Sequence, residues 1–130
     1  MKRPAPLRVL VVDDHHDGAE TVGIMLQQLG CEVRLTHNGE EAIESAPAFE
    51  PELVILDLNM PGMDGYQTAT QLRKQTWSAK AAFVAHTAST DPSVAEKVRR
   101  AGFGYFVPKP ASVTAFEAIV TALRKMKRPD

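Results

Sequence analysis

A chain of 130 residues, 44% hydrophobic and 24% charged, has the apolar content for one core, so we expect a single domain over residues 1–130 with its core from about residue 7 to 126. The net charge of −1 excludes the strong field expected of a protein that binds nucleic acid or a membrane surface, so neither is expected as a direct partner. Cys31 has no second cysteine with which to form a disulfide. No apolar run approaches the roughly 20 residues of a membrane span, and the start MKRPAPLRVL lacks the apolar stretch of a signal peptide. Together these features favour the cytoplasm.

The first 30 residues predict a strand and an amphipathic helix. Residues 8–12, RVLVV, form a short aliphatic run that is typical of a buried strand. Apolar residues then recur at the spacing of a helix face, and Asp17 with Glu20 has the spacing of a capping box at the helix start. Gly30 stands where this helix is expected to end.

The same unit recurs in the next part of the chain. Residues 32–36 are predicted to form a second strand. Asn38 and Glu41 have capping spacing and open a helix. That helix should end before Pro47, because proline has no N–H for the helical hydrogen bond. Residues 53–56, LVIL, then predict a third strand that is buried on both faces.

Two further helices and a strand follow. Asp64 and Gln67 open a helix that is expected to run to about Lys74. Residues 81–86, AAFVAH, predict the fourth strand. The Asp91–Pro92 pair predicts a fourth helix, with the aspartate as its cap and the proline at its first helical position.

A short strand at residues 105–107 and a strongly amphipathic helix complete the pattern. The apolar face of that helix consists of Val113, Phe116, Ile119, Val120 and Leu123. Five strands alternating with five helices, several of the strands apolar throughout, predict an α/β fold. We expect a doubly wound, five-stranded parallel sheet of flavodoxin-like order 2-1-3-4-5, with helices on both faces.

Polar side chains end four of the five predicted strands, at the edge where such sheets bind ligands. They are Asp13 and Asp14, Asp57, His86 and Thr87, and Lys109, in strand order one, three, four and five. Because strands one and three are neighbours in the predicted order, three carboxylates should meet there and recruit a hard cation such as Mg²⁺. A nucleophilic Asp57, a metal, Lys109 and the hydroxyl of Thr87 are the parts needed to accept a phosphoryl group.

Four motifs occur in the order and spacing of one known family. They are VLVVDD, LVILDLNMPGMDG, HTA after the fourth strand, and Lys109–Pro110. From about Leu7 to Met126 the chain therefore resembles the receiver domain of bacterial two-component response regulators. The segments GFGYFVPKP and DDHHDGAE look closest to receiver modules of hybrid sensor kinases.

The resemblance implies a phosphorelay function with Mg²⁺ as cofactor. Asp57 would be the phosphoacceptor. Asp13, Asp14 and Asp57 would hold Mg²⁺, together with the backbone carbonyl of Asn59. The donor would be a phosphohistidine on a sensor histidine kinase or histidine phosphotransfer domain. An output domain or a covalently linked kinase core would be a further partner, and the domain would catalyse only its own phosphorylation and dephosphorylation.

The resemblance also implies roles around the transferred group. Thr87 and Lys109 would bind its oxygens, with a cis peptide bond between Lys109 and Pro110. Phe106 takes the place of the family's switch aromatic but has no hydroxyl, and Pro108 removes a backbone donor at the end of the fifth strand. Movement of Thr87 and Phe106 would switch the surface formed by the fourth helix, the fifth strand and the fifth helix.

Two other functions are compatible with parts of the pattern. An aspartyl-phosphate phosphatase of similar fold would carry a second acid two residues after its nucleophile, where this chain has Asn59. A pseudo-receiver that only contacts other proteins would lack key site residues, and here all are present.

Other notable residues have simpler interpretations. We interpret His15 and His16 as solvated loop residues rather than zinc ligands, and His86 as a strand-end packing residue rather than a group that controls access to the site. The basic residues 124–128 are interpreted as complementing the dipole of the last helix. The fourth helix has few apolar anchors and is expected to be the mobile one; they are Val94, Ala95, Val98 and Ala101.

Overall fold

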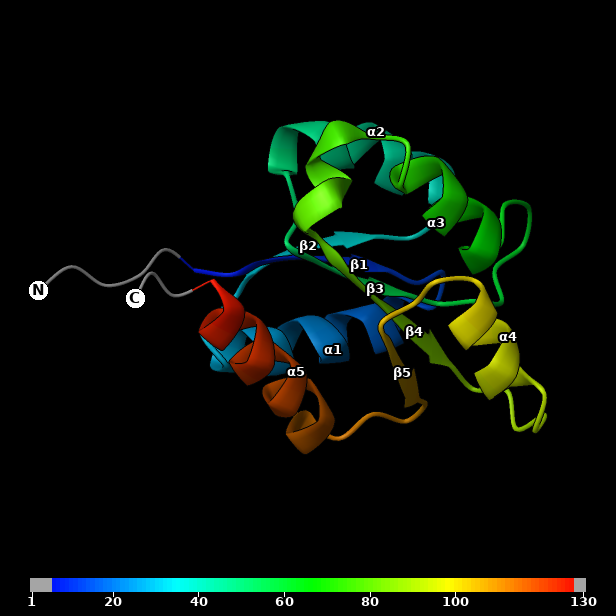
Figure 1. Ribbon diagram of the computed structural model, residues 1–130. Coiled ribbons are helices and arrows are strands. Elements are labelled where there is room, and N and C mark those ends of the chain that lie inside the picture. Colours follow the sequence, from blue (N-terminus) through cyan, green and yellow to red (C-terminus); the bar gives the residue numbers. More distant parts are fainter. Residues whose placement is uncertain (1–5, 128–130) are drawn as a thin grey trace, which may run out of the picture.

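Five parallel strands form one sheet in the order β2-β1-β3-β4-β5 (Figure 1). The computed structural model describes residues 6–127, so the two ends of the predicted domain, the first residues of MKRPAPLRVL and Arg128 lie outside it. The strands are β1 (Arg8–Val12), β2 (Glu32–Thr36), β3 (Leu53–Leu56), β4 (Ala82–Thr87) and β5 (Tyr105–Pro108). The predicted order, and with it the flavodoxin-like fold, is confirmed.

Helices cover both faces of this sheet. They are α1 (His16–Gln28), α2 (Gly39–Phe49), α3 (Gly65–Leu72), α4 (Val94–Arg100) and α5 (Val113–Met126), with a short 3-10 turn η1 (Thr76–Lys80). Figure 1 shows α1 and α5 on one face, α2 and α3 on the other, and α4 beside the β4–β5 edge. Among the helices within residues 6–127, none has the length and apolar character required to cross a lipid bilayer.

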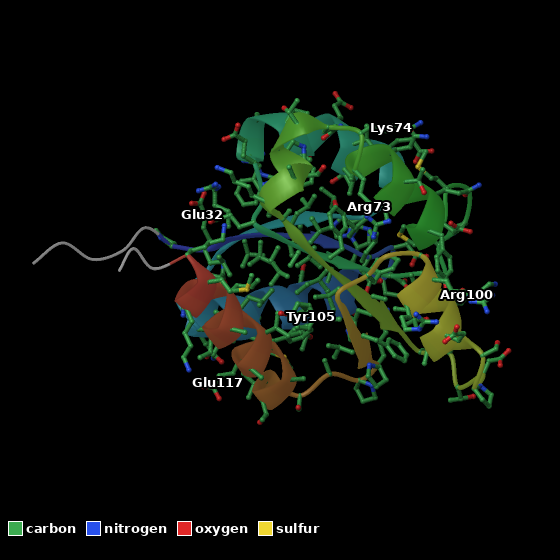
Figure 2. The ribbon with its side chains drawn as sticks, in the orientation of Figure 1. Glu32, Arg73, Lys74, Arg100, Tyr105 and Glu117 are labelled. Carbon is green, nitrogen blue, oxygen red and sulfur yellow. The ribbon has the colours of Figure 1, made fainter. Side chains whose placement is uncertain are left out.

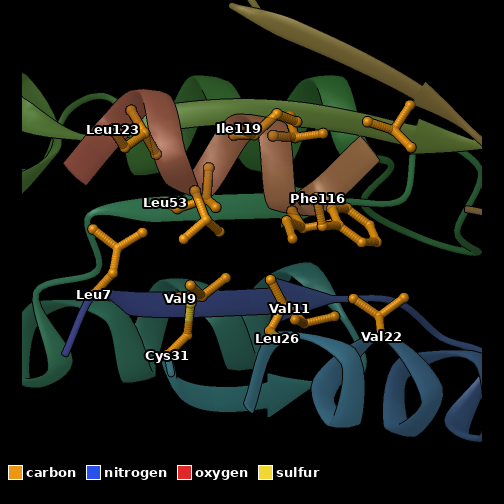
Figure 3. Packing of buried hydrophobic residues seen from close by; sticks show 14 of the residues in the cluster. Leu7, Val9, Val11, Val22, Leu26, Cys31, Leu53, Phe116, Ile119 and Leu123 are labelled. Carbon is orange, nitrogen blue, oxygen red and sulfur yellow. The ribbon is translucent and has the colours of Figure 1, made fainter. Parts of the chain in front are cut away.

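The strands bury both of their faces in two separate apolar clusters. Val9 and Val11 of β1 point toward α1 and α5, whereas Leu10 and Val12 point toward α2 and α3, as the alternation of a strand requires. Figure 3 shows the first cluster, in which Phe116 of α5 lies over the sheet. This burial on two faces explains why the strand sequences are apolar without alternation.

Helix α5 buries most of its predicted face. Phe116, Ile119, Val120 and Leu123 are buried, but Val113 is 42% exposed, because it lies in the first turn, beyond the edge of the cluster. The last turn carries the basic residues Arg124 and Lys125, as predicted.

Helix α1 begins two residues earlier than the predicted cap at Asp17 implies. Its N-cap is His15, and no side chain caps the free N–H groups of the first turn, so the predicted capping box of Asp17 and Glu20 is wrong. Asp17 lies inside the first turn, where its charge complements the helix dipole. The chain therefore enters the helix directly from the loop that carries the site acids.

Helix α2 continues through Pro47, which the sequence predicted would end it. A proline in a helix leaves the carbonyl four residues earlier without its N–H partner. Here that carbonyl belongs to Ile43, and the side chain of Gln75 donates a hydrogen bond to it at 3.1 Å. The last turn also buries Phe49, so the helix is stabilised past the proline. The predicted caps Asn38 and Asp64 both accept the expected backbone hydrogen bond.

Helix α4 is short and begins at Val94, after a turn at Asp91, so the prediction that Pro92 is its first residue is wrong. Val98 is its one buried residue, and the predicted anchor Ala95 is exposed.

The C-terminal end of α4 is joined to α3 by Arg73, labelled in Figure 2. The Arg73 guanidinium donates to the carbonyl of Ala101 at 2.7 Å and lies over the rings of Phe83 and Phe103. The partly buried Val94 and Ala101 also pack against the apolar cluster that contains Val98, so α4 is attached through few apolar side chains and through Arg73 at its end.

Candidate functional site

The register of β1 and β3 brings two aspartates to the same edge of the sheet. Val12 of β1 lies opposite Leu56 of β3, and the chain continues directly into Asp13 and Asp57. The backbone N–H of Asp57 donates to the carbonyl of Val12 at 2.9 Å, which extends the ladder by one bond. The two carboxylates therefore lie side by side at the carboxyl ends of adjacent strands, as predicted.

Three carboxylates and one imidazole converge at this edge. One ligand atom from each of Asp13, Asp14, His15 and Asp57 lies within 4.8 Å of all the others. Asp13 and Asp57 are buried, with 2% and 3% of their surfaces exposed, whereas Asp14 is half-buried. The sequence predicted the three acids but not the histidine.

Lys109 is the cation that reaches the buried acids. Its Nζ lies 2.8 Å from Oδ2 of Asp13 and 3.5 Å from Oδ2 of Asp57. The backbone N–H of Lys109 donates to the carbonyl of Thr87 at 2.9 Å, and the Lys109–Pro110 peptide bond is cis, as predicted. The ammonium group of Lys109 is therefore shared by two carboxylates.

The two buried aspartates differ in proton affinity. Burial, with a smaller contribution from the charge of Asp13, raises the pKa of Asp57 to about 6. The hydrogen bond from the Asn59 N–H and the charge of Lys109 act in the opposite direction but are outweighed. Burial also disfavours the charged form of Asp13, but the hydrogen bond from Lys109 and the N–H of His15 outweigh it and hold its pKa below the ordinary value. Asp13 is thus the acid that Lys109 stabilises as a carboxylate.

Two carboxylate oxygens in this cluster are buried without a hydrogen-bond partner among the described residues. They are Oδ1 of Asp14 and Oδ2 of Asp57. A buried charged oxygen without a partner is costly, and converging carboxylate oxygens are the donor set that a hard divalent cation prefers. The residues present therefore fit a Mg²⁺ site.

The hydroxyl of Thr87 is linked to Asp57 through Asn59. It accepts hydrogen bonds from the side-chain amide of Asn59 at 3.0 Å and from the N–H of Ser89 at 3.4 Å. Because the oxygen accepts in both bonds, the hydroxyl hydrogen is free to donate. Asn59 also donates its backbone N–H to Oδ1 of Asp57 at 3.1 Å, so it orients both side chains.

A glycine allows the loop after β3 to fold back on the site. Gly65 donates its N–H to the carbonyl of Leu58 at 3.1 Å. A Cβ at Gly65 would overlap the carbonyl oxygen of Asp57 and come within 2.7 Å of the Cα of Leu58. Only glycine permits this approach of two backbones, which fixes where Asp57 stands.

Three other histidines lie near the site. His16 stacks on His37 with ring centroids 3.8 Å apart, and Nδ1 of His37 donates to the backbone carbonyl of Asp13 at 3.0 Å. The sequence did not single out His37, because nothing in the pattern after the second strand marks it.

His86 is buried, donates from Nδ1 to the carbonyl of Val107 at 2.7 Å and lies edge-on to Phe116. Burial lowers its pKa, so the neutral ring is favoured. These contacts confirm its interpretation as a strand-end packing residue.

Phe106 and Pro108 lie on β5, opposite Ala85 and Thr87 of β4. Phe106 is half-buried and packs against the apolar cluster under α2 and α3. Pro108 is exposed and the ladder resumes at the N–H of Lys109, so the missing donor is tolerated at this edge strand. The role of Phe106 as a switch stays a prediction.

Curated relatives of the chain occur in two-component signalling. The chain is 33% identical over 122 residues to the sensor histidine kinase AtsR of Burkholderia thailandensis, which covers 91% of this chain and 20% of the kinase. It is 32% identical to the nitrate/nitrite response regulator protein NarL of Escherichia coli, over 82% of this chain and 50% of NarL. The chain thus spans half or less of the length of these relatives.

Solved structures share the fold almost completely. The chemotaxis protein CheY4 of Vibrio cholerae superposes with a TM-score of 0.84 at 26% identity, covering 92% of this chain and 99% of that protein. The receiver domain of a sensor histidine kinase from Pseudomonas aeruginosa, solved with a magnesium ion coordinated in its active site cleft, gives a TM-score of 0.81 at 25% identity, covering 92% and 98%. Residues 9–122 match the family described as the response regulator receiver domain, and the chain therefore belongs to this family of two-component signalling domains.

Proposed function

We propose that this domain accepts a phosphoryl group on Asp57 in a Mg²⁺-dependent reaction and thereby switches a protein surface. The observation that carries the proposal is the buried, unpartnered Oδ2 of Asp57, which faces Asp13, Asp14 and Lys109. This oxygen has no hydrogen-bond donor, and the one nearby ammonium, that of Lys109, is shared with Asp13, so a divalent cation would supply the charge that is missing. The Mg²⁺-bearing receiver domain from Pseudomonas aeruginosa supports the choice of ion.

Each residue has a defined part in the transfer. Asp13, Asp14 and Asp57 would hold Mg²⁺ with the backbone carbonyl of Asn59, and the bound ion would neutralise charge on the transferring phosphoryl oxygens. One oxygen of Asp57 forms a bond to phosphorus as the phosphorus–nitrogen bond of a phosphohistidine breaks. The leaving imidazole keeps the electron pair and takes a proton from solvent.

The phosphoryl oxygens would find two fixed donors. Lys109 is already oriented by Asp13, and the free hydroxyl hydrogen of Thr87 would donate to a second oxygen. Thr87 would then leave Asn59 and draw the β4 end toward Asp57. We propose that Phe106 follows it and that α4, β5 and α5 rearrange, because α4 buries only Val98 among its residues.

The partners follow from the family. We propose a sensor histidine kinase or a histidine phosphotransfer domain as donor, in the cytoplasm, where the buried free thiol of Cys31 is stable. A covalently linked kinase core or an output domain is a further proposed partner, because the chain covers only 20% of AtsR and 50% of NarL. The domain would act on itself rather than turn over external substrates.

A phosphorylated aspartate can be mapped directly. The chain is incubated with acetyl phosphate and Mg²⁺, the acyl phosphate is trapped by borohydride, and the modified residue is identified by mass spectrometry. We expect modification at Asp57 and none in Asp57→Asn. Equal labelling of that variant would overturn the assignment, and steady hydrolysis of a phosphomonoester over many turnovers would favour the phosphatase.

A further inference from the structure

The imidazole of His15 is part of the carboxylate cluster. Its Nδ1 lies 3.3 Å from Oδ1 of Asp13, 3.3 Å from Oδ1 of Asp14 and 3.9 Å from Oδ2 of Asp57. The side chain is 70% exposed, so the ring stands on the solvent side of the two buried acids. The sequence interpretation of His15 as a solvated loop residue therefore misses its contacts.

The fold fixes this position through the start of α1. His15 is the N-cap residue, but its side chain caps no backbone N–H of the helix. Its own backbone N–H donates to Oδ1 of Asp13 at 3.0 Å, which anchors the residue to the cluster. The ring nitrogen is therefore directed at the carboxylates rather than used by the helix.

Nδ1 of His15 is within hydrogen-bond distance of Oδ1 of Asp13, and the separations also fall in the range of donor atoms around a shared ion. Bonds of about 2.1 Å in an octahedral site place neighbouring donors about 3 Å apart and opposite donors about 4.2 Å apart. The three distances from Nδ1 of His15 lie between 3.3 and 3.9 Å. Independently, Oδ2 of Asp57 is buried and unpartnered, and it faces the same space.

The neighbouring histidines do not share this geometry. His16 stacks on His37, and Nδ1 of His37 is engaged by the backbone carbonyl of Asp13. Within residues 6–127, His15 is the histidine whose ring nitrogen joins the three acids.

We propose that His15 is a fourth side-chain ligand of the divalent site, so that the site favours first-row transition ions such as Mn²⁺ and Ni²⁺ over Mg²⁺. The inference rests on the proposed metal site at Asp13, Asp14 and Asp57. Mg²⁺ prefers oxygen donors throughout, whereas an imidazole nitrogen suits the later first-row ions and raises their affinity along the Irving–Williams order. Nδ1 would ligate through its lone pair, and the exposed Nε2 would carry the ring proton.

Affinities of the whole chain for Mg²⁺, Mn²⁺ and Ni²⁺ test this proposal by calorimetry at about pH 8, where protons compete least for the ligands. In His15→Ala we expect Ni²⁺ to bind roughly tenfold or more weakly and Mg²⁺ to change by less than about threefold. His16→Ala removes the adjacent imidazole and is the matched control, with no change expected.

Electron spin echo measurements on bound Mn²⁺ give a second, direct readout. Imidazole nitrogen modulation is expected in the wild type and in His16→Ala, and it should be absent in His15→Ala. Unchanged Ni²⁺ affinity and unchanged modulation in His15→Ala would overturn the inference while leaving the Mg²⁺ site intact. Tighter Mg²⁺ binding with unchanged Ni²⁺ binding in His15→Ala would also overturn it, since His15 would then hinder the ion rather than hold it. Failure of all three ions to bind the wild type would instead overturn the metal site itself.

Discussion

The ammonium nitrogen of Lys109 lies 2.8 Å from Oδ2 of Asp13, closer than its 3.5 Å separation from Oδ2 of Asp57. The lysine is thus held by Asp13 and reaches toward Asp57, the proposed phosphoacceptor. A cation fixed in advance stabilises developing charge on a transferring group without first having to be positioned.

Replacing Lys109 by methionine should separate metal binding from phosphoryl transfer. Without the ammonium, the three carboxylates attract Mg²⁺ more strongly, so its affinity should rise several-fold. Phosphorylation by acetyl phosphate should slow by about 100-fold, because one donor to the phosphoryl oxygens is lost. Calorimetry and intact-mass kinetics measure the two effects. Lys125→Met, an exposed cation in α5, should change neither; weaker Mg²⁺ binding in Lys109→Met would contradict this account.

Asp57→Asn should stabilise the metal-free protein at neutral pH. Burial raises the pKa of Asp57 from 3.8 to about 6, so the stability that its protonated form provides is present below pH 3.8 and is lost as the pH rises through about 6. Above that range the variant should be more stable by on the order of 2 kcal/mol. The difference in stability between the variant and the wild type should vanish near pH 3.8. Urea unfolding with EDTA at both ends of the range measures it, and a less stable variant at neutral pH would show that burial of the charge is not the dominant effect.

Thr87→Val should weaken binding of the phosphoryl analogue beryllofluoride by roughly tenfold or more, because the hydrogen bond from the hydroxyl to a fluorine, which stands in for a phosphoryl oxygen, is lost. Mg²⁺ affinity should not change, since Thr87 is no part of the carboxylate cluster. Thr87→Ser keeps the hydroxyl and should bind the analogue within about threefold of the wild type. Unchanged binding in Thr87→Val, or weaker binding in Thr87→Ser than in Thr87→Val, would show that the hydroxyl does not carry the effect.

Gly65→Ala should cost at least about 2 kcal/mol of stability, because the new Cβ overlaps backbone atoms that cannot move independently of Asp57. Gly104→Ala is the control. A Cβ there meets nothing within 4 Å, and its effect should lie within about 0.5 kcal/mol. Chemical denaturation compares the two; similar stabilities would mean that the loop after β3 is free to shift.

Strand positions and the polar groups at their ends could be predicted from sequence because both depend on local pattern and on strand order. The course of α2 through Pro47 could not, since it depends on Gln75, a residue far along the chain that replaces the lost hydrogen bond. The exposure of His15 was predicted correctly, but its contacts with the acids were missed for a related reason. Its contacts follow from α1 starting at His16, and helix starts are the least certain part of a sequence pattern.

The hydrogen bond from Asn59 to Thr87 also could not be predicted from the sequence, because it joins the loop after β3 to the last residue of β4. The pattern identified both residues near the site but could not show that one restrains the other. The structure adds this restraint, which phosphorylation would have to break.

Fluorine NMR of beryllofluoride tests the central claim most directly, because bonding of this analogue to Asp57 requires both the carboxylate and, in this account, a divalent ion beside it. We predict a bound fluorine signal for the wild-type chain with Mg²⁺, lost on addition of EDTA and absent in Asp57→Asn. A bound signal that persists without Mg²⁺, or in Asp57→Asn, would contradict the assignment of this cluster as a phosphoryl acceptor.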